Sequence, residues 1–260
     1  MTLLRYPFFA LIVALLTGVG MPSLSAAAEH SRELVVGVEN QSYLPLSSYE
    51  KGVYGGFARA LLDAFAREQG FTLRYQALPV PRLYAAFFQG EVDFKFPDHP
   101  EWKKPDRAGR TIAYSLPVVT YIDGVSVRPG SKGAGADRIR VLGTVAGFTP
   151  WAWQDRLAAG KATLSENTTS EGLVRQTLAG RVDGAYASVA VINYQLDHVL
   201  KTPGALVFDP ALPHSRDSYH LSSLKHPELI AAFDQWLKQN ARKVAALKHQ
   251  YAVEKGVRPE

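Results

Sequence analysis

Early in the chain, hydrophobic and polar positions follow the periods of strands and helices in turn. The run Leu34-Val35-Val36-Gly37-Val38 is continuously apolar, which is typical of a buried strand. From Phe57 the apolar residues recur at helical spacing until Gly70, which predicts a helix between them. The full pattern predicts a strand over 33–38, a helix over 57–69, a strand over 71–75, a helix over 81–88 and a strand over 92–96. This βαβαβ order predicts a mostly parallel sheet covered by helices.

The same order returns later in the chain. Strands are predicted over 138–143 and 182–187, and helices over 150–159, 173–179 and 189–200. Between the two halves, residues 121–128 alternate apolar and polar positions and end in Pro129-Gly130, which predicts a strand that crosses from one half to the other. Residues 227–252 carry an apolar stripe at helical spacing, which predicts a helical C-terminal segment packed on the core.

The first 28 residues have the three parts of a secretory signal peptide. Arg5 supplies a positive charge, residues 6–20 are uncharged and mostly apolar, and Ser25-Ala26-Ala27-Ala28 offers small residues for cleavage after Ala28. The alternative is a membrane anchor, but a spanning helix needs about 20 apolar residues and this run is shorter. We therefore expect an exported, soluble periplasmic protein.

Composition narrows the chemistry further. The chain has 260 residues, no cysteine and a net charge of +5. The absence of cysteine excludes disulfides, thiolate metal sites, a cysteine nucleophile and a lipidated cysteine. The basic residues are spread along the chain, so a nucleic-acid stripe is not expected. Neither a histidine and acid set with metal spacing nor a nucleotide-binding loop is present, so we expect no metal and no cofactor.

Two short motifs carry a resemblance to a known family. Phe88-Gln89-Gly90-Glu91-Val92-Asp93 and Leu178-Ala179-Gly180-Arg181-Val182-Asp183 both resemble the "L-x-x-G-x-x-D" step of the bacterial extracellular solute-binding proteins of family 3. Gly55-Gly56-Phe57 and the loop over 143–149 match further segments in the same order. These proteins are the polar amino-acid binders of ABC importers.

The resemblance implies an α/β fold of the two-lobed periplasmic binding protein type (type II). Each lobe would be a mostly parallel sheet flanked by helices, with two crossing hinge strands between the lobes. The lobes would be 29–123 together with 216–260, and 124–215, after a signal peptide over 1–28. The protein would close on a small ligand by hinge motion and deliver it, as a monomer, to a membrane permease of an ABC importer.

Two departures from the family change the expected ligand. The family places an acid for the ligand's ammonium where this chain has Ser188, and a hydroxyl cannot offset a buried charge as a carboxylate can. The family's carboxylate-binding arginine follows a shorter loop that contains a threonine, and Arg107 is the nearest match here. We therefore expect a small polar ligand that is anionic, or neutral and partly aromatic, rather than an ordinary amino acid. The alternative is that Asp98 binds the ligand's ammonium from the opposite lobe.

The candidate ligand-binding residues come from strand ends and helix starts. Asp98 and His99 follow the carboxyl end of a strand, where α/β sheets bind ligands, although a capping Asp and a surface His would fit equally well. Lys95 lies in an apolar strand, so it reaches solvent, pairs with an acid such as Asp98, or faces the cleft. Arg82 begins a helix, where it would bind an anionic group or be solvated. The complete predicted set is Tyr43, Arg82, Phe96, Asp98, His99, Arg107, Phe148, Thr149, Tyr186 and Ser188, in which the aromatic rings would form apolar walls and Phe148 and Thr149 would precede free helix N–H groups.

Three functions fit these features. The first is a solute-binding protein without catalysis. The second is a periplasmic enzyme on the same fold, similar to the cyclohexadienyl dehydratases, in which Asp98, His99 or Glu101 would act as a general acid. The third is a ligand-sensing accessory module for a membrane receptor, which also needs only ligand-gated closure.

Overall fold

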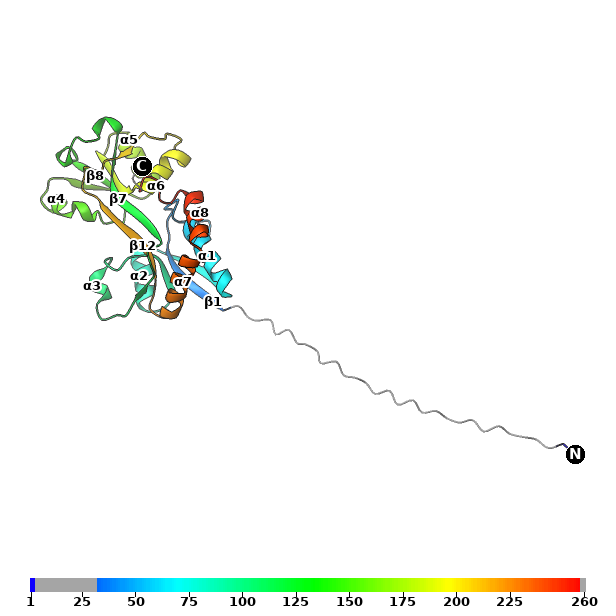
Figure 1. Ribbon diagram of the computed structural model, residues 1–260. Coiled ribbons are helices and arrows are strands. Elements are labelled where there is room, and N and C mark those ends of the chain that lie inside the picture. The colour runs from blue at the N-terminus through cyan, green and yellow to red at the C-terminus, as the bar shows by residue number, and fades with distance from the viewer. Residues whose placement is uncertain (3–31, 258–260) are drawn as a thin grey trace. The chain divides into compact units, whose positions relative to one another are not determined.

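The computed structural model describes residues 1–2 and 32–257, so nearly all of the predicted signal peptide lies outside the described residues. The residues from 32 onward belong to one compact unit (Figure 1). Its strands are β1 (Glu33–Glu39), β2 (Ser48–Glu50), β3 (Val53–Gly55), β4 (Thr72–Leu78), β5 (Phe94–Asp98), β6 (Ala113–Tyr114), β7 (Val119–Val127), β8 (Val141–Val145), β9 (Thr163–Asn167), β10 (Gly184–Ser188), β11 (Val207–Phe208) and β12 (Ser215–Ser223).

The helices alternate with these strands in both halves of the chain. The α-helices are α1 (Phe57–Gln69), α2 (Val80–Phe88), α3 (Lys104–Arg107), α4 (Gln154–Ala158), α5 (Ser170–Leu178), α6 (Val189–Tyr194), α7 (Pro227–Gln239) and α8 (Ala241–Tyr251). Short 3₁₀ segments are η1 (Pro129–Ser131), η2 (Ala136–Arg138) and η3 (Trp151–Trp153), and α6 continues into a π-helical turn, η4 (Gln195–Val199).

Among the described residues, ten strands form one sheet in the order β4-β1-β5-β12-β7-β10-β8-β9, with β6 on β12 and β11 on β7. β1 is parallel to β4 and β5, and β8 is parallel to β9 and β10. β12 is antiparallel to β5 and β7, and β7 is antiparallel to β10. The α/β class is therefore confirmed, but the sheet is mixed, because the long strands β7 and β12 run against their neighbours.

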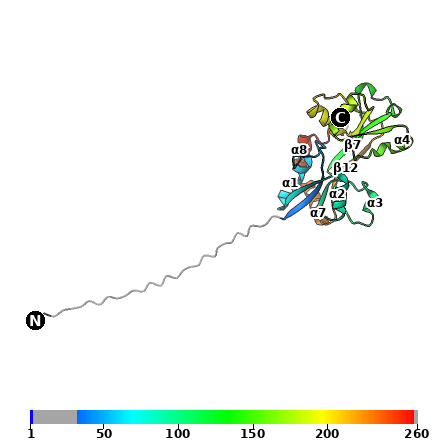
Figure 2. The same cartoon turned by 180° about the vertical axis from the view of Figure 1, so that it is seen from behind.

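β7 and β12 occupy the middle of the molecule. In both views they run side by side between a group that includes β1, α1, α2 and α7 and a group that includes β8 and α4 (Figure 1, Figure 2). β7 corresponds to the crossing strand predicted over 121–128, whereas β12 is a second crossing strand whose own residues gave no such prediction. Elsewhere the helix expected over 150–159 is divided into η3 and α4, and the C-terminal helical segment is divided at Asn240.

The two halves repeat one arrangement of backbone and carboxylate. In the first half, Oδ2 of Asp93 accepts a hydrogen bond from the backbone N–H of Val35 at 2.7 Å. In the second half, Oδ2 of Asp183 accepts from the N–H of Val141 at 2.8 Å. The repeated G-x-x-D step therefore has a structural role, because each aspartate holds the start of the neighbouring parallel strand.

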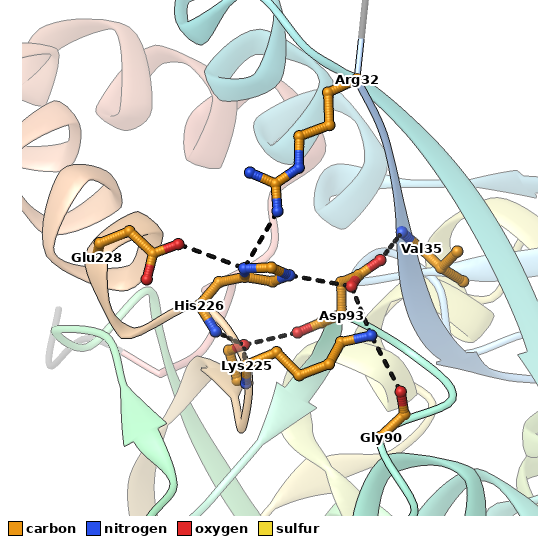
Figure 3. Close-up of polar contacts among 8 residues, drawn as sticks. Arg32, Val35, Gly90, Asp93, Lys225, His226 and Glu228 are labelled. Atoms are coloured by element: carbon orange, nitrogen blue, oxygen red, sulfur yellow. Dashed lines mark hydrogen bonds and ion pairs between the residues drawn. The ribbon is translucent and has the colours of Figure 1, made fainter.

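Asp93 has additional partners that its counterpart lacks. Figure 3 shows its carboxylate between Val35 and the segment before α7, where Oδ1 lies 2.7 Å from Nζ of Lys225 and 3.0 Å from Nε2 of His226. Nζ of Lys225 also donates to the carbonyl of Gly90 at 3.0 Å. Burial alone would raise the pKa of Asp93, but these donors together lower it. The cluster ties α7 to the first half of the sheet.

A pair of glycines repeats in the same way. A Cβ atom on Gly37 of β1 would lie 2.7 Å from Cδ1 of Leu83 on α2, and one on Gly143 of β8 would lie 2.7 Å from Cδ1 of Leu173 on α5. Each glycine therefore allows a helix to approach its strand closely.

Asp98 and Ser188 occupy equivalent strand ends in the two halves, because each follows its repeated aspartate at the same separation along the sequence.

Candidate functional site

One face of the crossing strands gathers polar and aromatic side chains. Asp123 of β7 lies opposite Ser188 of β10 on one side and opposite Ser215 of β12 on the other. Residues paired across a ladder share a face, and so do alternate residues along a strand. The crossing-strand face defined in this way contains Tyr121, Asp123, Tyr186, Ser188, Ser215, Asp217 and Tyr219.

The loop after β1 reaches this face through Tyr43. The backbone N–H of Ser188 donates to the Tyr43 hydroxyl at 3.3 Å. The Tyr43 ring stacks on Phe148, with ring centroids 5.1 Å apart. Tyr43 belongs to the first half of the chain, and Ser188 and Phe148 belong to the second. The loop therefore connects the two halves beside the crossing strands.

The loop after β5 covers the other end of the same face. Nε2 of His99 lies 2.9 Å from the Asp217 carboxylate. The Trp102 ring contacts Tyr219 edge-on, with centroids 5.9 Å apart. Tyr219 in turn stacks on Tyr121 at 4.3 Å. Aromatic rings from one loop and two strands thus form a continuous wall, which is suited to a flat or aliphatic surface.

Asp123 is the unusual residue of the face. Its Oδ1 is buried and has no hydrogen-bond partner within the part of the chain that the structure describes. Burial raises its pKa to about 7. Burial also raises the pKa of Tyr43, Tyr121, Tyr186 and Tyr219, and the Asp123 charge adds to each increase, so the four phenols lie within electrostatic reach of this carboxyl.

A second buried charge cluster is fully paired. Asp98 and Lys95 are both 0% exposed, and Nζ of Lys95 lies 3.1 Å from Oδ1 of Asp98. Arg107 binds both oxygens of Asp98, at 2.6 Å and 3.2 Å, and the Ser222 hydroxyl donates to Oδ2 at 2.6 Å. Burial alone would raise the pKa of Asp98, but Lys95 and Arg107 outweigh it and hold that pKa below its usual range. Of the three possibilities for Lys95, the structure therefore has the pair with Asp98.

The predicted site residues fall into three groups. Tyr43, His99, Phe148, Tyr186 and Ser188 meet at the crossing-strand face. Asp98 and Arg107 bind each other, and Phe96 is buried in the apolar core. Arg82 and Thr149 are exposed. Whether each of them touches a ligand stays a prediction.

The anion site expected near Thr149 has fewer free backbone N–H groups than the sequence predicts. The N–H of Trp151 donates to the Thr149 carbonyl at 2.9 Å, and the N–H of Trp153 donates to the Pro150 carbonyl at 2.9 Å. Residues 151–153 form a 3₁₀ turn rather than the first turn of a long helix. Two of the N–H groups expected to be free here are therefore used within the tighter turn, and the anion site stays a prediction.

The sequence alone had not indicated Trp102, Tyr121, Asp123, Asp217 or Tyr219. One available signal was an acid at an alternate position in the predicted crossing strand, in Tyr121-Ile122-Asp123. Within the described residues, no group of three or more acidic and histidine side chains is arranged to hold a metal ion. The helices described between residues 32 and 257 are all too short or too polar to cross a membrane.

Comparison with known proteins relates this fold to solved structures. No family model and no curated protein sequence matches the chain. An ancestral amino-acid-binding protein, a precursor of cyclohexadienyl dehydratase, matches with a TM-score of 0.64 and 23% identity over 84% of this chain and 95% of its own. The arginine-, lysine- and histidine-binding protein of Geobacillus stearothermophilus matches with a TM-score of 0.66 and 22% identity over 85% and 95%.

A third match has a similar extent. It is a protein of Wolinella succinogenes, assigned as the binding component of an ABC transporter and complexed with lysine, with a TM-score of 0.70 and 18% identity over 86% of this chain and 97% of its own. At these identities the likeness concerns the fold. Across most of its length, this chain therefore has the α/β fold of the amino-acid-binding periplasmic proteins of ABC transporters.

Proposed function

We propose that this protein is a periplasmic solute-binding protein that captures a small polar solute and delivers it to the permease of an ABC importer. The observation that carries the proposal is the meeting of three loops from both halves of the chain over one face of the crossing strands. Tyr43 bonds to Ser188 and stacks on Phe148, and His99 binds Asp217. A solute at this place would touch both halves at once. Its binding energy would therefore favour the arrangement in which the halves are close together.

The proposed movement follows from the sheet topology. Two lobes, 29–123 with 216–260 and 124–215, would be joined by β7 and β12. Most of the core around Phe57, Phe65 and Phe233 belongs to the first lobe, and the core around Leu142 and Trp153 belongs to the second. This division would allow each lobe to move as a unit, with the bending confined to the two strands.

Labels on the two lobes test this closure. The chain contains no cysteine, so Glu91→Cys and Lys161→Cys place two spin labels at exposed positions, one on each lobe. A thermal-shift screen over amino acids, organic acids and amines supplies the solute. The distance between the labels should shorten when the solute is added. A pair within one lobe, Arg67→Cys with Glu91→Cys, is the matched control and should show no change.

Two results would contradict the proposal. One is a protein that no member of the screen stabilises, since a solute at 100 times its Kd should add about 2.7 kcal/mol to the free energy of unfolding. The other is a solute that binds without changing the distance between the lobes.

Binding without catalysis fits the charge cluster better than a dehydratase does. A general acid must carry a proton at the working pH. Lys95 and Arg107, acting against burial, hold the pKa of Asp98 below its usual range, so this carboxyl is ionised at neutral pH. Asp98 therefore does not supply the proton that a dehydratase needs, and incubation with prephenate tests the remaining acids of the site for formation of an aromatic keto acid.

A further inference from the structure

The crossing-strand face contains a carboxylate oxygen without a partner. Within the described residues, the buried Oδ1 of the partly exposed Asp123 has no hydrogen-bond partner, whereas the fully buried Asp98 binds Lys95, Arg107 and Ser222. An ionised carboxylate taken out of water is costly unless a cation or several donors compensate it. No described residue donates to Oδ1 of Asp123, so this oxygen is available to a positive group from outside the chain.

The surroundings of Asp123 suit a positive group of a particular kind. Four tyrosines lie around it: Tyr43 from the loop after β1, Tyr121 from β7, Tyr186 from β10 and Tyr219 from β12. Phenol oxygens accept hydrogen bonds, and aromatic rings attract ammonium and guanidinium groups. All four tyrosines are nearly inaccessible to solvent, which strengthens both interactions.

The side chains that would have favoured an anion are placed elsewhere. Lys95 and Arg107 both bind Asp98, in a cluster that keeps one net positive charge, and Arg82 is exposed at the start of α2. The remaining charged groups around the face are Asp217, which binds His99, and Glu39, whose charge reaches Tyr43. The ionisable groups on the strands of the face are thus acids, Asp123 and Asp217, whereas the sequence alone predicts a positively charged site.

We propose that Asp123 is the acceptor for the charged nitrogen of a small organic cation, an ammonium or a guanidinium, enclosed by Tyr43, Tyr121, Tyr186 and Tyr219. This inference rests on the proposed function, and it names the class of solute that the protein captures. The charge would be recognised from a crossing strand, rather than from Ser188, where the resembling family has its acid. A carboxylate on the solute is not required, because Arg107 is bound to Asp98.

The elevated pKa of Asp123 predicts that the affinity for a cation depends on pH. With a pKa of about 7, roughly half of these carboxyls carry a proton at pH 7, and a bound cation must displace it. Affinity for a cation should therefore rise about tenfold from pH 6 to pH 8. A guanidinium stays charged across this range, so the change in affinity would reflect the titration of Asp123 and not of the ligand.

Calorimetry with matched probes tests the inference. Arginine, agmatine and citrulline share a similar chain, but agmatine lacks the carboxylate and citrulline lacks the charge. Arginine and agmatine should bind at least 10- to 100-fold more tightly than citrulline. Asp123→Asn should remove this difference and the pH dependence. Asp137→Asn, an exposed acid paired with Arg156, is the control and should behave as the wild type.

The outcomes separate the two proposals. Equal affinity for arginine and citrulline, or full affinity of Asp123→Asn for agmatine, would overturn the cation site. Tight binding of an organic acid with lobe closure would also overturn it while leaving the proposed function intact. If no solute of the wider screen binds, both fail. A melting curve of Asp123→Asn verifies that the variant is folded, which we expect because the substitution keeps the shape and removes an unpaired charge.

Discussion

Replacing Asp123 by asparagine is expected to stabilise the protein without ligand at high pH. In the folded chain, burial raises the pKa of Asp123 to about 7, against an ordinary value of 3.8. The folded state therefore keeps a proton that the unfolded state releases between pH 4 and pH 7. The stability of the wild type should fall as the pH rises through this window and become level above it.

The magnitude follows from the size of the pKa change. A shift of about 3 units, at about 1.4 kcal/mol for each unit, corresponds to roughly 4 kcal/mol in total. Linkage places roughly 2.5 kcal/mol of this between pH 5 and pH 8. Asp98 does not interfere, because its pKa is lowered by Lys95 and Arg107 against the effect of burial. Its stabilising contribution is lost only as the pH falls below about 4.

Urea unfolding at pH 5 and pH 8 measures the effect. The free energy of unfolding of Asp123→Asn minus that of the wild type should be larger at pH 8 by roughly 2.5 kcal/mol. Asp137→Asn should show no such pH-dependent gain, because Asp137 is exposed and its pKa is lowered by the Arg156 hydrogen bond. If the difference between Asp123→Asn and the wild type is the same at both pH values, the buried carboxyl is not destabilising and the reasoning is refuted.

Three further substitutions have expected outcomes. Asp98→Asn leaves the Lys95 ammonium buried without a charged partner and should lower the free energy of unfolding by about 3–5 kcal/mol in urea, where a loss below 1 kcal/mol would contradict the paired cluster. Tyr43→Phe removes the hydroxyl that accepts from the Ser188 N–H, so it should cost about 0.5–1.5 kcal/mol in the same assay, and an unchanged midpoint would show that this contact contributes nothing. Gly143→Ala should cost about 1–3 kcal/mol, since its Cβ would lie 2.7 Å from a leucine methyl on α5, and a neutral result would mean that α5 moves away freely.

The repeated layout could be predicted from the sequence because it depends on local patterns. Apolar periodicity shows which side of an element is buried, whatever lies opposite. For this reason, α1, α2 and β1 appear in the structure close to their predicted bounds. Only part of the second half could be predicted in this way. β9, with the polar sequence Thr-Leu-Ser-Glu-Asn at the edge of the sheet, lacks the apolar run that marks a buried strand.

For the site too, the position of some residues could be predicted from local patterns, but their charge partners could not. Tyr43 and Ser188 could be identified because they follow the ends of predicted strands, and strand ends gather ligand-binding residues. The state of the charged residues could not be identified in this way. For Lys95, a cleft position and a pair with Asp98 were both consistent with the sequence.

The sequence by itself determined the α/β class, the repeated halves and one crossing strand. Only the tertiary structure decided that Asp98 is paired with cations and that Oδ1 of Asp123 has no hydrogen-bond partner among the described residues. The physical reason is the range of the interactions involved. Periodicity is set by neighbours along one element, whereas the partner of a buried charge depends on which strands lie side by side. β12 brings Ser222 to Asp98, and β7 places Asp123 among tyrosines from distant segments.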